Sequence, residues 1–303
     1  KMAAVAHVVR RVSLSLGERV GVRDSFPAAR KPTGVLSPHP LQRIHPLRAA
    51  QHVPCREAMR DLASLSITGR RSNNEDNLCV DAALQLFAVA DGLGGYDAGE
   101  VASALTVEAL RDFVARCRRD PEGTWPGRGT KTRSLSENLL AMGALEAHHA
   151  IAAQKRGTSS QMGSTVAVAL LEGATLTVAH VGDSRVYCFR DGRLLPLTED
   201  HSMYAQLKAS GADVPPRHLF QFKNQITRAL GLPADHLADT SVFTVQPGDR
   251  VLLCTDGLYD PFTDEALAEL VPGGDAKTAV QRLVDAAFAA GSHDNITVVV
   301  IDV

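Results

Sequence analysis

The stretch Leu86-Phe87-Ala88-Val89-Ala90-Asp91-Gly92 joins a run of apolar residues to an aspartate and a glycine. Two later apolar runs lead into a similar pair, Gly-Asp at the end of residues 176–183 and Asp-Gly at the end of residues 251–257. A fourth run, within residues 294–301, begins just after an aspartate. Short apolar runs bounded by turn residues are typical of buried strands. The sequence therefore predicts a fold in which several strands end beside aspartates.

Aspartates gathered at one edge of a sheet repel one another, so a pocket formed by them needs cations to be stable. A single Asp-Gly pair is weak evidence because most such pairs are plain turns. The recurrence of the pattern at four strand ends is what indicates a metal site.

The composition is that of an ordinary globular protein, with 303 residues, 45% hydrophobic and 22% charged. Charge is unevenly distributed, because residues 1–60 carry 11 Lys/Arg against 3 Asp/Glu and six of the 15 prolines. We predict a basic, poorly ordered extension over residues 1–60 and one catalytic domain over residues 61–303. An Arg-rich targeting segment and a nucleic-acid-binding arm are alternatives for the extension. Five cysteines lie far apart with no Cys-x-x-Cys pair, which favours free thiols in a reducing cytoplasm.

The periodicity of the core predicts more strands than helices. Strands are expected over residues 62–68, 84–90, 165–171, 175–181, 185–189, 194–197, 241–245, 250–254 and 296–303. An early helix is expected to bury Val101, Leu105, Ala109, Leu110, Phe113 and Val114, and a late one Val280, Leu283, Val284, Ala287 and Phe288. Ser134 and Glu137 form a capping box for a helix that ends near residue 154.

This distribution predicts an α+β fold in which two stacked, mainly antiparallel sheets are flanked by helix pairs. Residues 201–231 show no clear period, and we interpret them as a lid beside the acidic pocket. No apolar run approaches the roughly 18 residues of a transmembrane helix.

Seven short blocks then occur in an order that resembles the type 2C metal-dependent Ser/Thr protein phosphatases in their bacterial form. They are residues 69–76 (GRRSNNED), 91–95 (DGLGG), 163–165 (GST), 181–185 (VGDSR), 226–231 (ITRALG), 255–258 (TDGL) and 294–297 (DNIT). The resemblance covers residues 62–303 and implies a double antiparallel β-sandwich flanked by helices.

The resemblance also implies a centre of two Mn²⁺ or Mg²⁺ ions with a third, weaker ion, and oxygen ligands suit these metals. Asp91 would bridge the two ions and the Gly92 carbonyl would bind one of them, while Asp256 and Asp294 hold the other. Glu75 and Asp76 would act directly or through water. Asp183, together with Asp256, would bind the third ion. A hydroxide shared by the two ions would then attack the phosphorus of phosphoserine or phosphothreonine.

Arg71 stands four residues before Glu75, the spacing at which the family carries the arginine that clamps the substrate phosphate. A planar guanidinium can hold two phosphate oxygens at once. Arg70 is the neighbouring alternative, and a solvated surface arginine is the ordinary role of either. We expect the catalytic set to be Arg71, Asp91 and Asp256.

One position departs from many eukaryotic members, which carry a histidine considered the general acid where this chain has Leu93. Bacterial members commonly have an apolar residue there. His180, His201 and His293 are alternative proton donors only by default, and we expect each to be structural or exposed.

Phosphorylated proteins, such as a Ser/Thr kinase and its targets, are the expected partners of a cytoplasmic monomer without nucleic-acid or membrane partners. A pseudophosphatase that binds phosphoproteins without turnover is one alternative, although every expected carboxylate is present. A phosphatase of an anti-sigma-antagonist regulator is another. Residues 61–303 carry 21 Lys/Arg against 31 Asp/Glu, and this excess of acidic residues disfavours nucleic-acid binding.

Overall fold

The computed structural model describes residues 59–94, 98–120, 129–155, 161–233 and 238–303, apart from the side chain of His218. The predicted extension over residues 1–60 lies almost entirely outside these residues. At the start of the described residues, Met59 packs on the core and the Arg60 amide donates to the carbonyl of Asp302 at 2.8 Å.

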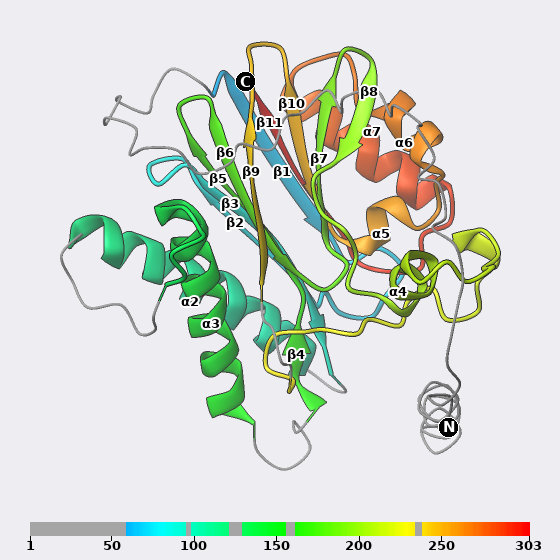
Figure 1. The fold of residues 1–303 in the computed structure, drawn as a ribbon. Helices are drawn as coiled ribbons and strands as arrows, with labels where there is room; N and C mark the ends of the chain where they lie inside the picture. The colour runs from blue at the N-terminus through cyan, green and yellow to red at the C-terminus, as the bar shows by residue number, and fades with distance from the viewer. Residues whose placement is uncertain (1–58, 95–97, 121–128, 156–160, 234–237) are drawn as a thin grey trace, which may run out of the picture. The chain divides into compact units, whose positions relative to one another are not determined.

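Two antiparallel sheets form the centre of the domain (Figure 1). The first has the order β1-β11-β10-β7-β8, with bounds Asp61–Ile67, Ile296–Asp302, Arg250–Cys254, Arg185–Arg190 and Arg193–Pro196. The second has the order β2-β3-β5-β6-β9, with bounds Asp76–Asp81, Leu86–Leu93, Val166–Glu172, Thr175–Val181 and Asp239–Thr244. A short strand, β4 (Gly163–Ser164), pairs with the end of β3.

Helices cover the outer face of each sheet, so the domain has four layers. Helices α2 (Ala98–Arg119) and α3 (Leu135–Gln154) pack on the second sheet. Helices α5 (Asp256–Tyr259), α6 (Asp264–Leu270) and α7 (Ala276–Ala289) pack on the first sheet. Side chains from both sheets, such as Val89, Ala167, Leu253 and Val299, fill the layer between them. The predicted fold class is confirmed.

The segment between β8 and β9 holds helix α4 (Met203–Ala209) and the 3-10 turn Arg217–Leu219, in agreement with the irregular-to-helical prediction for residues 201–231. Its two ends are joined, because the Met203 amide donates to the Gln225 carbonyl at 2.9 Å and Ser202 forms a bridge with Ile226.

Three predictions about the elements were wrong. Strand β2 was missed because residues 76–81 (DNLCVD) lack a continuous apolar run, and this strand is specified by its pairing with β3. Helix α2 buries Ala102 and Thr106, whereas Val101 is 45% exposed. Phe288 of α7 is 44% exposed instead of packed in the core. The other residues of these predicted faces agree with the prediction, since Leu110, Phe113 and Val114 of α2 and Val280, Leu283, Val284 and Ala287 of α7 are buried.

The capping box of α3 is present, with the Glu137 amide donating to the Ser134 hydroxyl and the Ser134 amide donating to the Glu137 carboxylate. Four cysteines fall within the described residues and all are free: Cys79, Cys188 and Cys254 are buried, and Cys117 is half-buried. Cys55 lies outside them. Among the described helices, no segment is long and apolar enough to cross a bilayer.

Candidate metal centre

Pairing of β2 with β3 places two of the predicted ligands side by side. Asp76 is the first residue of β2 and stands opposite Asp91 in the antiparallel register. Asp91 and the following Gly92 continue β3 instead of ending it, and Gly92 pairs with Ser164 of β4. A side chain could not replace the hydrogen at Gly92, since a Cβ there would lie 1.9 Å from the Gly99 carbonyl oxygen. The start of α2 therefore approaches the strand at the predicted carbonyl ligand.

Asp76 is buried and held by two threonines, one that caps α5 and one from β11. Its Oδ2 accepts hydrogen bonds from the Thr255 hydroxyl at 2.8 Å and from the Thr297 hydroxyl at 2.7 Å. Thr255 directly precedes Asp256, and Thr297 belongs to β11. Both bonds fix the same carboxylate oxygen of Asp76.

Asp183 lies in the turn that leads from β6 of the second sheet to β7 of the first, and Asp256 begins α5. Asp183 follows β6 in the turn to β7, and its carbonyl accepts a hydrogen bond from the Tyr259 hydroxyl at 2.9 Å. Tyr259 lies in α5, the helix that begins at Asp256. The guanidinium of Arg185 lies 3.6 Å from the centre of the Tyr259 ring, and that of Arg217 lies 4.9 Å from it. Both aspartates are buried.

Asp294 and Glu75 are connected through Asn295. The Asn295 side chain accepts a hydrogen bond from the Glu75 amide at 2.8 Å and donates to the carbonyls of Thr68 and Asn73, each at 2.9 Å. The loop between β1 and β2 is thereby fastened to the start of β11, next to Asp294. No role was predicted for Asn295 from the sequence. Its position between Asp294, a predicted ligand, and the apolar run that begins at Ile296 is the pattern that could have identified it.

The carboxylates are close enough to perturb one another electrostatically. Burial raises the pKa of Asp91 well above its ordinary value, and the neighbouring charge of Asp256 raises it further. Burial likewise raises the pKa of Asp256, helped by the charge of Asp183. For Asp76 burial raises the pKa to about 7, although the bonds from Thr297 and Thr255 oppose this. For Asp183 burial and the charge of Asp200 raise the pKa to about 7.

Oxygen atoms grouped in this way fit hard divalent cations. Mutually repelling, partly buried carboxylates are stabilised when a cation neutralises them. The donor set contains carboxylates and the Gly92 carbonyl, and it lacks the thiolates that would select softer metals.

The two arginines of the GRRSNNED block take different positions. Arg71 donates from Nη2 to Asp294 Oδ2 at 2.7 Å and from Nε to the His293 carbonyl at 3.1 Å, and its side chain is 54% exposed. Arg70 lies over the Phe288 ring, 5.4 Å from its centre. Arg71 is thus the arginine beside the carboxylates, whereas Arg70 is held against α7.

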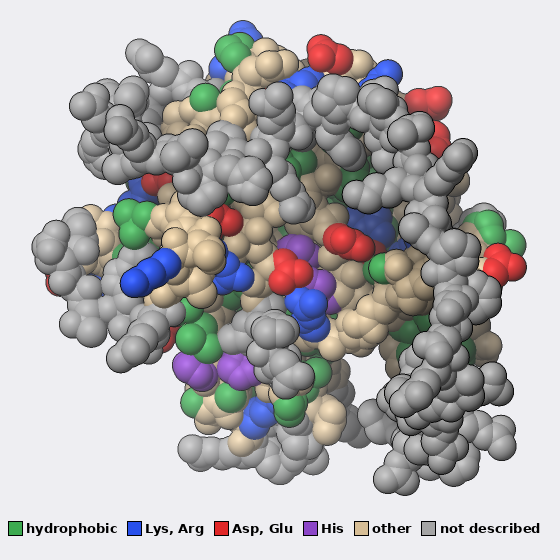
Figure 2. All heavy atoms as spheres, viewed as in Figure 1, with side chains coloured by type: hydrophobic (Ala, Val, Ile, Leu, Met, Phe, Trp, Pro, Cys, Tyr) green, Lys and Arg blue, Asp and Glu red, His purple; other side chains and the backbone are tan. Residues whose placement is uncertain are grey.

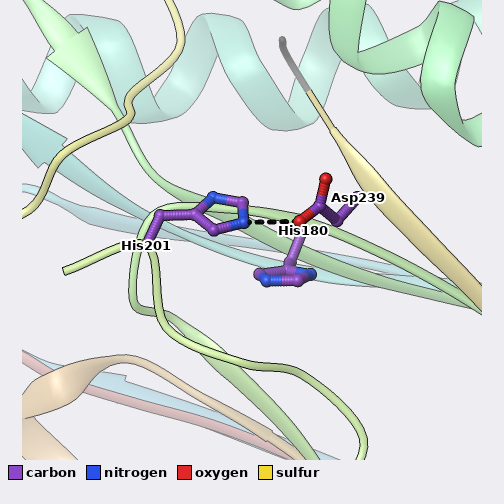
Figure 3. A group of neighbouring side chains, drawn as sticks. All are labelled: His180, His201 and Asp239. Carbon is purple, nitrogen blue, oxygen red and sulfur yellow. Dashed lines mark hydrogen bonds and ion pairs between the residues drawn. The ribbon is translucent and has the colours of Figure 1, made fainter. Parts of the chain in front are cut away.

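Within the described residues, the side chains of the three histidines named as default proton donors form no hydrogen bond with this group of carboxylates. His180 and His201 are buried and stacked on each other with ring centres 4.4 Å apart, next to Asp239 (Figure 3). His293 is exposed.

Residues 68–290 match the model of the family described as protein phosphatase 2C. The chain belongs to the protein phosphatase 2C family. The blocks that carried the resemblance in the sequence lie largely within this match, and the α+β sandwich is the fold of the solved relatives.

Curated relatives and solved structures are similar over most of the domain. The serine/threonine protein phosphatase PstP of Mycobacterium tuberculosis is 37% identical over 238 residues, covering 77% of this chain and 43% of PstP. The serine/threonine phosphatase stp of Listeria monocytogenes is 31% identical over 249 residues, covering 77% of this chain and 91% of the relative. A crystal structure of the PstP catalytic domain in complex with two manganese ions is 32% identical, with a TM-score of 0.64 and coverage of 80% and 96%.

Proposed function

We propose that this chain is a metal-dependent protein serine/threonine phosphatase. The observation that carries the proposal is the gathering of Asp76, Asp91, Asp183 and Asp256 into one site where burial and mutual repulsion raise their pKa values. Relatives that carry this activity in their names share the fold, and PstP is described with two manganese ions. Because the chain spans 43% of the length of PstP, the proposal concerns the domain described above.

We infer that Asp91, the Gly92 carbonyl, Asp256 and Asp294 hold two Mn²⁺ or Mg²⁺ ions, with Glu75 and Asp76 acting directly or through water. Asp183 and Asp256 would hold a third, weaker ion. When bound, such ions activate water toward phosphorus and neutralise the charge that develops on the phosphoryl oxygens. The threonines that bind Asp76 keep one of its oxygens fixed, so that the other is available for a ligand role.

The chain's own residues would bind and orient the substrate. Arg71 is exposed and stands beside Asp294, so its guanidinium can turn from that carboxylate to a phosphate ester that enters the site. An exposed ion pair of this kind stabilises by about 0–1 kcal/mol, which allows the exchange of partners. Leu93 lies beside Gly92 and cannot donate a proton to the leaving alkoxide.

The partners that fit this function are phosphorylated proteins. A Ser/Thr kinase and its targets are the expected class. We propose that residues 201–231 act as a lid, and the bond from the His201 amide to the Gly182 carbonyl, next to Asp183, supports this.

Phosphate release from a phosphothreonine peptide tests the function. We expect turnover with millimolar-range Mn²⁺ or Mg²⁺, because a carboxylate site open to solvent leaves several waters on each ion. Treatment with EDTA should abolish turnover and added Mn²⁺ should restore it. Full turnover after EDTA would contradict metal dependence, and Mn²⁺ binding without turnover of any phosphopeptide would support the pseudophosphatase alternative.

Stabilisation by Mn²⁺ should depend on pH. Without metal, the raised pKa of Asp76 and of Asp183, each about 7 in the fold against 3.8 ordinarily, contributes stability that is present below about pH 4 and is lost as pH rises through 7. Mn²⁺ requires the ionised forms, so it must displace these protons at low pH. We expect apparent Mn²⁺ affinity to be on the order of 10–100-fold weaker at pH 5.5 than at pH 7.5.

Thermal melts with and without Mn²⁺ at both pH values measure this difference. Asp183→Asn, which removes one of the carboxylates with a raised pKa, should make the pH dependence smaller. An equal Mn²⁺-induced shift in Tm at both pH values would contradict the proposed proton displacement.

A further inference from the structure

A second cluster of ionisable side chains lies on the Asp183 side of the metal centre. It consists of His180 near the end of β6, His201 ahead of α4 and Asp239 at the start of β9 (Figure 3), together with Arg228, which binds Asp239. Figure 2 shows histidine, acidic and basic side chains together on the face that Figure 1 presents. The cluster borders a cavity of about 200 Å³ that is also lined by Thr227 and by α4.

His201 holds both backbone polar groups of Gly182, the N–H of the Val181–Gly182 peptide and the carbonyl of the Gly182–Asp183 peptide. Its backbone N–H donates to the Gly182 carbonyl at 2.8 Å, and its ring Nδ1 accepts from the Gly182 N–H at 3.2 Å. Gly182 has a φ of +97°, and a Cβ there would lie 2.6 Å from Cγ2 of Thr165. Gly182 therefore has to be glycine, and its contacts set the direction in which the chain enters Asp183.

The Gly182 N–H also determines the state of the His201 ring. A backbone amide is always a donor, so Nδ1 must carry a lone pair and Nε2 must carry the hydrogen. The Nε2–H then donates to Oδ2 of Asp239 at 3.0 Å. Arg228 Nη1 donates to the other oxygen of Asp239 at 3.2 Å. The same nitrogen lies 3.2 Å from His201 Nε2, but both atoms carry hydrogens in this tautomer, so that contact is not a hydrogen bond. Asp239 thus orients the ring so that Nδ1 faces Gly182.

This geometry argues against a metal ion between His180, His201 and Asp239. The two rings are stacked with an angle of 28° between their planes, so their in-plane lone pairs cannot converge on one ion. Nε2 of His180 donates to the Glu199 carbonyl at 2.7 Å, and Nε2 of His201 carries the hydrogen directed at Asp239.

We propose that His201, oriented by Asp239, is a positioning residue that fixes the Gly182 peptide and through it the carboxylate of Asp183. The inference rests on the proposed role of Asp183 as a metal ligand. The Tyr259 hydroxyl bound to the Asp183 carbonyl holds the other side of the same turn.

His201 also joins this turn to the base of the 201–231 segment. Its carbonyl accepts a hydrogen bond from the Thr227 amide at 2.7 Å, and Ser202, the next residue, caps α4. A substrate contact that moves residues 201–231 would therefore also move Asp183, because His201 is bonded to both parts of the chain.

Two substitutions of His201 form a matched pair. In His201→Asn the side-chain oxygen can stand where Nδ1 stands and accept from Gly182, whereas in His201→Gln the amide reaches toward Asp239 and leaves the Gly182 N–H without its acceptor. The backbone bond to the Gly182 carbonyl remains possible in both variants.

Amide hydrogen exchange of Gly182, measured by NMR on the metal-free protein, tests the contact itself. We expect His201→Gln to speed exchange at Gly182 by about 10–100-fold, the scale of one lost hydrogen bond, and His201→Asn to change it less than about 3-fold. The amide of Leu253 in β10 serves as the reference for general destabilisation. Equal exchange at Gly182 in His201→Gln and the natural protein, or acceleration at Leu253 by the same factor, would overturn the proposal.

Calorimetric Mn²⁺ titration tests the link to Asp183. His201→Gln should weaken, by about 10-fold, the same class of Mn²⁺ sites that Asp183→Asn removes, and it should have no further effect in the Asp183→Asn background. An additive effect in the double variant would overturn the link. If Asp183→Asn leaves every class of Mn²⁺ site unchanged, Asp183 is not a metal ligand, and the link from His201 to metal binding is wrong as well. The exchange measurement tests the contact between His201 and Gly182 independently of that result.

Discussion

Asp256→Asn is expected to lower kcat for a phosphothreonine peptide by on the order of 1,000-fold and to weaken Mn²⁺ binding at the same time. Asp256 begins α5 and is buried between Asp183 and the carboxylates of the second sheet. The asparagine side chain is neutral, so the site attracts the cations less strongly. Fewer bound cations then neutralise the charge that develops on the reacting phosphate. Substrate and Mn²⁺ titrations on the variant measure the two effects separately.

Arg71→Ala provides the contrasting variant for this measurement. It should raise KM and lower kcat/KM by about 10–100-fold, the scale of a charge-assisted contact of about 1.5–3 kcal/mol. Mn²⁺ binding should change little, because the exposed pair with Asp294 contributes little to stability. If Arg71→Ala weakens Mn²⁺ as much as Asp256→Asn, or leaves kcat/KM untouched, the assignment of Arg71 as the phosphate clamp fails and Arg70 becomes the residue to test.

Asn295→Ala is expected to cause the largest loss of stability among single substitutions outside the proposed ligands. The change removes the partners of two backbone carbonyls and one amide, in Thr68, Asn73 and Glu75. Each polar group left without a partner costs about 1–3 kcal/mol when water cannot replace it, so we expect a loss of about 3 kcal/mol or more in the free energy of unfolding. Urea denaturation of the metal-free protein measures it.

Asn77→Ala is the matched control, because the Asn77 side chain accepts a hydrogen bond from the adjacent Leu78 amide and joins no distant segments. It should cost less than about 1 kcal/mol. A loss of similar size in both variants would show that the Asn295 bonds do not hold the loop between β1 and β2.

The sequence predicted those parts of the fold that local patterns determine. The strands at 175–181 and 250–254 and the capping box of α3 were placed correctly because apolar runs and capping residues act over a few neighbours. The positions of Asp91, Asp183, Asp256 and Asp294 at the ends of apolar runs indicated one shared pocket. Its assembly in the structure depends on the strand order of the two sheets, whereas the sequence indicated only that two mainly antiparallel sheets stack.

Features set by distant contacts were not predictable in this way. Strand β2 is polar, and pairing with β3 makes it a strand. Asn295 acts on residues more than 200 positions away, and Thr255 and Thr297 bind Asp76 across a similar separation. On α2, small residues such as Ala102 face the core while the larger Val101 is exposed, because helix packing there selects for close approach as well as for hydrophobicity.

Anomalous diffraction at the manganese absorption edge, from crystals grown with Mn²⁺, tests the proposed metal centre most directly. We expect two strong peaks beside the carboxylates of Asp91, Asp256 and Asp294, a weaker third peak beside Asp183, and no peak between His180, His201 and Asp239. Strong peaks confined to the histidine cluster, or no peak near Asp91 at saturating Mn²⁺, would contradict the proposed ligand set.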